Sequence, residues 1–223
     1  MLPWKQARKL PVVFYGKVQF RSLKGSLVIA GKICTGMIRV GVRNAYVDTS
    51  VQETIWTIKG TVYFAGPTHF NRGSYILVAR GAELYFGTQN SMYGSDLRIL
   101  CFKRIRIGNR VRIAWECQIY DTSFHYIEFT DSEKPVQPLP SPVEIGDRVW
   151  LGNRTTVSKG AVIPSDTIVA SNSMVNKDFS SVGPNSILAG IPATVKFKGV
   201  RRIFDKCEEA RLDKEFGYPR TGI

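Results

Sequence analysis

The chain has 223 residues, of which 43% are hydrophobic and 22% are charged, a composition typical of a folded chain with a sizeable core. No run approaches the ~18 apolar residues of a membrane-spanning helix, and no secretory signal opens the sequence. Lys and Arg number 31 against 18 Asp and Glu, a net charge of +13, but no zinc-finger, basic-zipper or RNA-recognition signature occurs, so we expect no nucleic-acid partner.

The four cysteines show no CxxC pair that would indicate a disulfide framework or a thiolate zinc site. Reduced thiols and a cytoplasmic location are therefore expected. The cysteines are Cys34, Cys101, Cys117 and Cys207.

The first part of the chain shows only a weak periodicity of its apolar residues. Residues 1–57 are rich in Val, Ile and Gly, and we interpret them as irregular N-terminal strands or early coils. From Ile58 apolar residues of uneven size recur at every sixth position, and the same spacing returns further along the chain. These positions are Ile58, Phe64, Phe70, Ile76 and Ala82, followed by Ile107, Ile113 and Ile119.

The clearest repeat lies between residues 143 and 175, where two tracks run in phase. One track is aliphatic, and the track two residues earlier is small or β-branched. Six is a multiple of the strand period of 2 but not of the helical period of 3.6. The spacing therefore predicts short strands joined by sharp turns. Three such strands form one coil, and stacked coils form a parallel β-solenoid. The tracks are Ile145, Leu151, Val157, Ile163, Val169 and Val175, and Val143, Val149, Thr155, Ala161, Thr167 and Ser173.

Two segments interrupt or end this repeat. Residues 123–142 contain four prolines and predict a loop projecting between two coils, a feature that is usually functional. Residues 201–216 have apolar residues at helical spacing and predict an amphipathic helix that caps the stack. The solenoid is thus expected over 58–198, and a C-terminal helical cap over 199–223.

Several motifs resemble those of the hexapeptide-repeat acyltransferases. IGDRVWLG at 145–152, SMVNKD at 173–178 and AGIPA at 189–193 match its coil and turn motifs, and residues 105–127 are similar to its sugar and polysaccharide O-acetyltransferases. The resemblance implies an all-β, left-handed parallel β-helix that works as a homotrimer with acetyl-CoA as co-substrate. The left hand comes from the family, because general crossover rules favour the opposite hand.

Acyl transfer to an alcohol needs a base, and the chain has two histidines. His125 lies where the family carries its catalytic histidine, immediately before the loop, and an imidazole suits this role near neutral pH. Its position six residues after Ile119 leaves a core role open. We expect no direct role for His69. Asp121 is a candidate to orient His125, as is Glu116, and each carboxylate could instead bond corner amides.

The resemblance also implies a groove for the pantetheine arm and phosphates of the coenzyme. The matching polar positions are Asn153, Ser171, Asn176 and Lys177, while Lys196 and Lys198 lie near the family's phosphate-binding cations. Each lysine could equally be a solvated charge. The oxyanion donor is expected to be a backbone N–H.

We expect an acetyl-CoA-dependent O-acetyltransferase that modifies a sugar hydroxyl of a bacterial surface polysaccharide or its precursor. Two alternatives stay open: a nucleotide-sugar N-acetyltransferase, and a non-catalytic scaffold that binds acidic polysaccharide. Two histidines cannot build a three-histidine zinc site, so no metal is expected. The positive charge suits an anionic acceptor or a membrane face, with at most peripheral membrane association.

Overall fold

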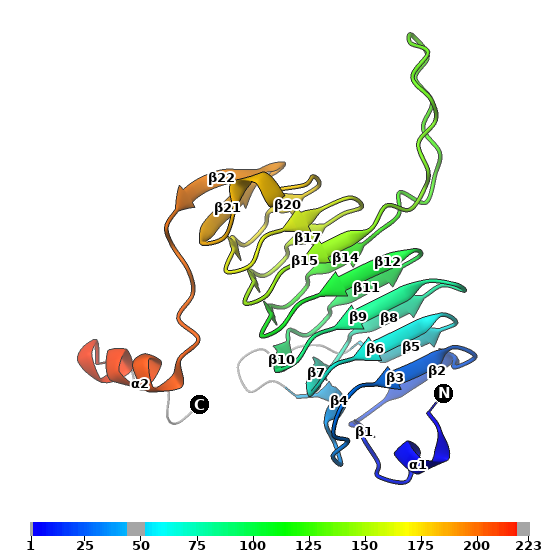
Figure 1. Cartoon of the computed structure of the whole chain (residues 1–223), viewed down its shortest axis with the longest axis vertical. Coiled ribbons are helices and arrows are strands. Elements are labelled where there is room, and N and C mark those ends of the chain that lie inside the picture. The colour runs from blue at the N-terminus through cyan, green and yellow to red at the C-terminus, as the bar shows by residue number, and fades with distance from the viewer. Residues whose placement is uncertain (1, 44–51, 218–223) are drawn as a thin grey trace.

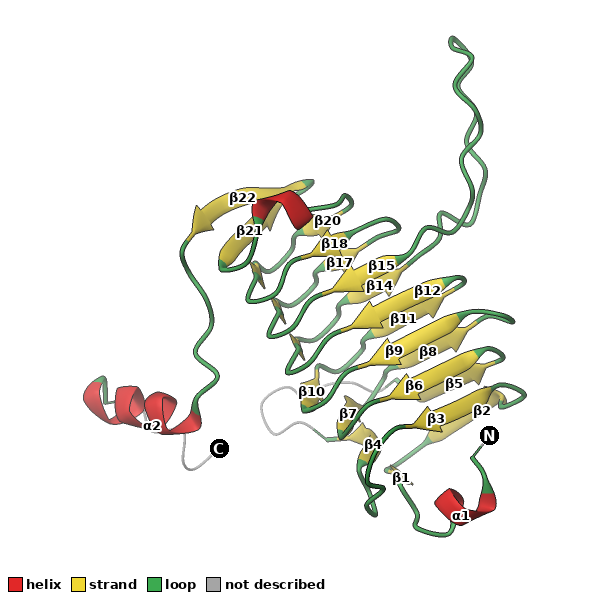
Figure 2. Cartoon of the chain, viewed as in Figure 1, coloured by secondary structure: helices red, strands yellow, loops and turns green. Residues whose placement is uncertain are grey.

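The computed structural model describes residues 2–43 and 52–217, and in it the chain winds into a three-faced parallel β-solenoid (Figures 1 and 2). Most strands pair in parallel with the strand three places further along, so successive strands belong to different sheets. Sheet A contains β1 (Val12–Phe14), β4 (Ile38–Val42), β7 (Thr68–Asn71), β10 (Asn90–Tyr93), β13 (Arg112–Ile113), β16 (Trp150–Leu151), β19 (Ile168–Val169), β21 (Ser186–Gly190) and the antiparallel β22 (Ala193–Lys198).

The other two faces are built in the same way. Sheet B contains β2 (Val18–Ser22), β5 (Thr54–Ile58), β8 (Tyr75–Val78), β11 (Arg98–Cys101), β14 (Gln118–Tyr120), β17 (Thr156–Val157) and β20 (Met174–Val175). Sheet C contains β3 (Ser26–Ile29), β6 (Thr61–Phe64), β9 (Glu83–Phe86), β12 (Arg104–Ile107), β15 (Val143–Ile145) and β18 (Val162–Ile163). Two short helices, α1 (Trp4–Ala7) and η1 (Ser180–Val182), and one longer helix, α2 (Lys206–Glu215), complete the described chain.

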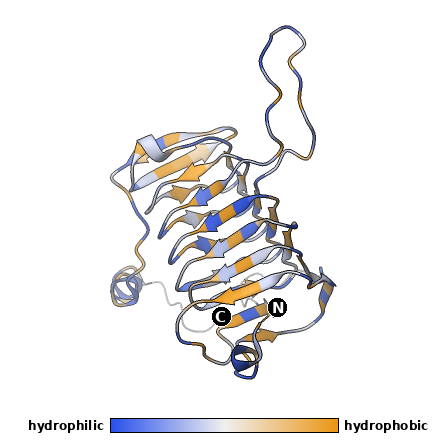
Figure 3. Cartoon of the chain, turned by 45° about the vertical axis from the view of Figure 1, so that its right-hand side comes forward, coloured by the Kyte–Doolittle hydropathy of each residue, from blue (hydrophilic) through white to orange (hydrophobic). Residues whose placement is uncertain are grey.

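The core of the solenoid is formed by the two predicted tracks. Every member of both tracks from Val143 to Val175 is buried, and hydrophobic and hydrophilic residues alternate along the strands (Figure 3). Leu151 lies beside Val169 and Val157 beside Val175, eighteen residues apart in each pair. The sequence prediction of three six-residue sides per coil is therefore confirmed in this part of the chain.

Earlier coils are longer, which explains their poor periodicity. Trp56 lies beside Ile76, twenty residues on, and Phe64 beside Phe86, twenty-two residues on. The extra residues sit in the corners, while the inward positions stay aligned. Strand β5 crosses the expected boundary at residue 57, and β1–β4 extend the same three sheets. Within the described residues the solenoid therefore begins with β1, well before residue 58.

Polar side chains tie the corners of neighbouring coils together. The backbone N–H of Thr88 donates to Oδ1 of Asn109 at 2.7 Å, the N–H of Asn109 to Oδ1 of Asp147 at 2.7 Å, and the N–H of Asp147 to Oγ of Ser165 at 3.0 Å. Corner backbones approach closely here: a Cβ on Gly146 would lie 2.5 Å from the nitrogen of Ser165. These contacts satisfy corner amides that have no strand partner.

The C-terminal segment runs back along the outer face of sheet A. The guanidinium carbon of Arg202 lies 5.5 Å from the Trp150 ring and 4.9 Å from the Phe204 ring, and that of Arg112 lies 5.8 Å from Phe204. Helix α2 follows, set off to the side of the stack (Figure 1), with none of its residues buried. A helix over this region is thus present, but its expected position as a cap over the end of the stack is wrong. Neither α1 nor α2 has the length and apolar character needed to span a membrane, among the residues described.

The inward track offers a direct test of the packing. Ile163→Ala should lower the free energy of unfolding by about 3 kcal/mol, because it opens a cavity in a filled coil. Val162→Ala, one residue away on the outer face, should cost less than ~1 kcal/mol. Urea unfolding followed by circular dichroism measures both, and equal losses would contradict the assigned faces.

Candidate active site

The predicted loop leaves the stack through a narrow two-stranded neck. It follows β14 and returns before β15, and the N–H of Ser123 donates to the carbonyl of Leu139 at 3.2 Å. Thr122 and Pro140 form an antiparallel bridge, and the N–H of Ser141 donates to the carbonyl of Asp121 at 2.7 Å. Beyond this neck the loop projects far from the solenoid (Figure 1). Ile107 still pairs with Ile145 across the excursion, so the loop leaves the register of the coils intact.

His125 lies in a tight turn just outside this neck. Its N–H donates to the carbonyl of Ser123 at 2.7 Å, and Phe124 between them has a φ of +63°. The Phe124 ring packs edge-on against Phe102 at 5.5 Å, which anchors the turn to the preceding coil. His125 itself is exposed, and no described residue forms a hydrogen bond with its imidazole. The open alternative of a core histidine is therefore wrong, because the turn carries His125 out of the inward track.

Lys159 supports the neck and was missed by the sequence analysis. Its Nζ donates to Oγ of Ser123 at 3.2 Å and to the carbonyl of Pro138 at 3.3 Å, joining both arms of the loop. Lys159 lies two residues after the inward Val157, as Lys177 lies two residues after the inward Val175. That repeated lysine at one-coil spacing was the available signal.

Asp121 is buried and holds the corner of the preceding coil. Its carboxylate accepts the backbone N–H groups of Phe102, Lys103 and Arg104 at 2.7, 2.7 and 2.8 Å. No hydrogen bond joins it to His125 in the described chain. These three contacts make Asp121 a corner residue in this structure, and its role in orienting the imidazole stays a prediction. Glu116 instead forms an exposed ion pair with Arg154 at 2.8 Å.

The buried thiols are not nucleophiles. Burial raises the pKa of Cys101, and the neighbouring Asp121 carboxylate raises it further. Burial likewise raises the pKa of Cys117 to about 12. Both sulfurs are thus protonated near neutral pH and pack as small apolar groups.

His69 lies on β7, on the outer face of sheet A, away from the loop. It pairs in register with Arg39 on β4. Partial burial and the Arg39 guanidinium lower the pKa of His69. The expectation that His69 has no direct role stays a prediction.

The expected coenzyme residues divide among three places. Asn176 and Lys177 follow β20, so they lie on the same corner of sheet B as the His125 turn, which follows β14. We call this corner the B edge: residues 123–125, 158–160 and 176–178 from its coils. Both Asn176 and Lys177 are exposed, and Nζ of Lys177 lies 5.2 Å from the Phe179 ring.

Asn153 and Ser171 lie on a different corner, after strands β16 and β19 of sheet A. Ser171 Oγ donates to Oδ1 of Asn153 at 2.5 Å, linking two coils. Lys196 and Lys198 are exposed on β22, at the last edge of sheet A. Within one chain, these four residues are therefore not brought together with His125.

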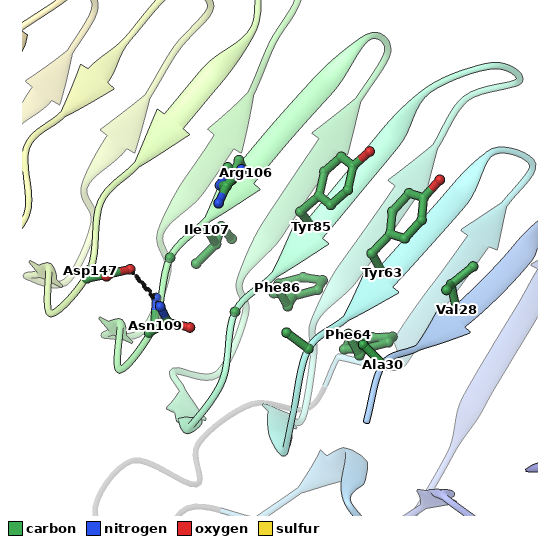
Figure 4. A pocket seen from close by; sticks show the side chains of 13 residues that line it. Val28, Ala30, Tyr63, Phe64, Tyr85, Phe86, Arg106, Ile107, Asn109 and Asp147 are labelled. Carbon is green, nitrogen blue, oxygen red and sulfur yellow. Dashed lines mark hydrogen bonds between the residues drawn. The ribbon is translucent and has the colours of Figure 1, made fainter. Parts of the chain in front are cut away.

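A separate hollow of about 320 Å³ lies at the corner that follows sheet C (Figure 4). The rings of Tyr63 and Tyr85 stack in parallel there at 4.3 Å, with Arg106 next in the same row. His125 does not line this hollow. In the described residues, no group of three or more His, Cys, Asp and Glu side chains is arranged to hold a metal ion.

Comparison with known proteins agrees with this architecture. No family model matches the sequence. Galactoside O-acetyltransferase of Escherichia coli K12 is 25% identical over 159 residues, which cover 71% of this chain and 70% of that protein. WbbJ of the same strain, to which a lipopolysaccharide biosynthesis O-acetyl transferase activity is attributed, is 28% identical over 141 residues, covering 58% of this chain and 69% of that protein.

The fold is shared with a solved structure. The crystal structure of the polySia-specific acetyltransferase NeuO superposes with a TM-score of 0.64 over 95% of this chain and 88% of that chain, at 18% identity.

The fold is a parallel β-solenoid that this chain shares with an acetyltransferase of known structure. In sequence the chain is similar to a galactoside O-acetyltransferase and to a lipopolysaccharide biosynthesis O-acetyl transferase.

The two candidate carboxylates should respond differently to substitution. Asp121→Ala should lower the free energy of unfolding by about 3 kcal/mol, since it strips three amides of a charged acceptor. Glu116→Gln should cost less than ~1 kcal/mol, because it breaks an exposed ion pair. Thermal unfolding measures both. A stable Asp121→Ala protein with a shifted pH profile of activity would instead favour a positioning role toward His125.

Proposed function

We propose that the protein is an acetyl-CoA-dependent O-acetyltransferase that acts in the cytoplasm on a sugar hydroxyl of a bacterial surface polysaccharide or its precursor. We further propose that it winds as a left-handed β-helix and works as a homotrimer. The observation that carries this proposal is the exposed His125 at the loop neck, on the edge that also carries Lys159 and Lys177. The sequence relationship to galactoside O-acetyltransferase supports the sugar acceptor.

The geometry suits His125 as a general base. Its backbone is fixed by the turn, while the imidazole stays free to meet an incoming hydroxyl. The imidazole takes the hydroxyl proton as the sugar oxygen attacks the thioester carbonyl. The tetrahedral intermediate then expels the coenzyme thiolate, which takes the proton back from the imidazolium. An ester and a free thiol result, and backbone N–H groups are the expected donors to the oxyanion.

The expected coenzyme-binding residues lie on different corners of one chain, an arrangement that fits a site between subunits. Asn176 and Lys177 share the B edge with His125, whereas Asn153 and Ser171 lie on another corner. In a threefold assembly the second corner of one subunit can face the B edge of the next, so both sets can line one groove. Lys177 is then suited to neutralise a coenzyme phosphate.

Replacement of His125 tests the catalytic assignment. His125→Ala should lower kcat by about 10²- to 10⁴-fold with little change in the KM for acetyl-CoA, since a general base acts in the transition state. His69→Ala is the matched control, because His69 is the other of the two histidines in the sequence and lies on another face. Release of free thiol with a sugar acceptor measures both.

The same assay distinguishes the product classes. An O-acetyl ester is cleaved by mild alkali, whereas an N-acetyl amide survives. Near-normal turnover by His125→Ala would remove the catalytic assignment, and an alkali-stable product would favour the N-acetyltransferase alternative. Absence of any heat with acetyl-CoA would favour the non-catalytic scaffold.

Substitution of Lys177 tests the binding of coenzyme A separately from catalysis. Lys177→Ala should weaken the binding of coenzyme A by about tenfold, because one charge-assisted contact to a phosphate is lost. Lys214→Ala on helix α2 removes an equally exposed charge and should leave the Kd unchanged. Isothermal titration calorimetry measures both, and unchanged affinity for Lys177→Ala would exclude this residue.

A further inference from the structure

The positive charge of the protein is concentrated at the start of the chain. Residues 1–43 contain nine Lys and Arg and no Asp or Glu, and they therefore account for +9 of the net +13. The first acidic residue in the sequence is Asp48. The nine basic residues are Lys5, Arg8, Lys9, Lys17, Arg21, Lys24, Lys32, Arg39 and Arg43.

These residues lie at one end of the solenoid. Helix α1 and strands β1–β3 form the first coil, at the foot of the stack and opposite the end that carries β21 and β22 (Figure 1). Six of the basic side chains belong to α1 or to this coil, and all six are exposed. They are Lys5, Arg8, Lys9, Lys17, Arg21 and Lys24. Among the described residues these six form no ion pair, and the guanidinium carbon of Arg21 lies 6.0 Å from the Tyr75 ring on β8.

The same end is apolar at its centre. A hollow of about 380 Å³ is lined by residues of α1, of β1–β3 and their connections, and by Trp56 of β5, and every described residue that lines it is apolar or aromatic. Phe14, Phe20 and Leu23 line it and are 42%, 41% and 36% exposed. Beside it, Trp4 is 77% exposed and Leu10 64% exposed. We call this surface, formed by residues 2–24, the basic–aromatic base.

We propose that the basic–aromatic base docks onto the surface of an anionic phospholipid bilayer. Exposed Trp, Phe and Leu side chains that alternate along the sequence with exposed Lys and Arg form the pattern that inserts shallowly at a headgroup layer while basic groups contact lipid phosphates. Each basic residue near such a surface adds a separate favourable contribution. An acidic polysaccharide would satisfy the charges but would leave the exposed apolar residues without a partner. Both features together favour the bilayer.

Docking by this end would fix the height of the proposed active site above the lipid. Strand β14, which precedes His125, is four coils above β2 in sheet B. At ~4.8 Å for each coil, His125 stands roughly 19 Å above the first coil. This consequence rests on the proposed function, and it suits an acceptor glycan that is attached to a lipid and extends several sugars from the surface.

Vesicle co-sedimentation of the full chain tests the docking. Phosphatidylcholine vesicles with and without phosphatidylglycerol are the probes. The protein should bind the anionic vesicles, bind phosphatidylcholine alone far more weakly, and dissociate when the salt is raised.

Two variants separate charge from apolar contact. Lys5→Gln/Arg8→Gln/Lys9→Gln should weaken vesicle binding about fivefold for each charge, on the order of a hundredfold in total. Trp4→Ser/Leu10→Asn should weaken it about tenfold without changing the charge. Both sets are exposed, so neither replacement disturbs the core. The matched control, Arg80→Gln/Lys206→Gln/Lys214→Gln, removes three exposed charges elsewhere and should bind vesicles nearly as the unmodified protein does.

The outcomes are distinguishable from those of the acyl-transfer proposal. Failure of the protein to bind anionic vesicles would overturn the docking, and turnover of a soluble sugar would be untouched by that result. Binding to heparin that depends on Lys5, Arg8 and Lys9, without binding to vesicles, would show that the base takes an acidic polysaccharide instead. An equal loss of vesicle binding in the matched control would show a general effect of net charge and would likewise overturn the proposal.

Discussion

The structure depends on the stacking of each coil in register on the next. Strands in this solenoid form their backbone hydrogen bonds with strands of other coils, and each inward side chain must fill the same triangular space as its neighbours. A shift of one residue would turn every inward side chain outward. Insertions are therefore confined to corners. Coil length varies from about eighteen to twenty-two residues, and a long loop follows Tyr120. Inward residues of neighbouring coils still pair in register, as Ile107 does with Ile145.

This constraint also explains where a site can form. Strand positions are fixed by packing, so chemically useful side chains gather at corners, where successive coils bring equivalent positions into one column. On the B edge this column contains Ser123, Lys159 and Lys177. Lys159 ties the loop to the stack, which holds His125 at a defined place beside a rigid wall. The projecting loop thus acquires a fixed root without any change in the core.

The strict six-residue repeat could be predicted from the sequence, whereas the structure of the corners could not. Leu151, Val157 and their partners were predictable because an exact period of six admits few structures. Strands before residue 58 were expected, but their register was not predictable, since corner residues of variable number hide the alignment of inward positions. Asp121 was ambiguous because a carboxylate near a histidine in sequence can orient a base or cap a corner. In the structure it accepts three corner amides, a pattern that the sequence does not encode. The position of α2 follows from two long-range contacts of the segment before it. Arg202 lies over the ring of Trp150, and Arg112 lies over the ring of Phe204. No local sequence pattern encodes such contacts.

A solenoid has two ends, and its core must stop at each of them. At the N-terminal end the inward column stops at Trp56 and Leu27, and the last apolar side chains, Phe14 and Phe20, are left about two-fifths exposed around an open hollow. An apolar end that remains bare promotes association of copies or aggregation. The six exposed basic residues of α1 and the first coil oppose association of copies through like-charge repulsion, yet they attract an anionic surface. The same residues therefore keep two such ends apart in solution while leaving the apolar hollow available to a bilayer.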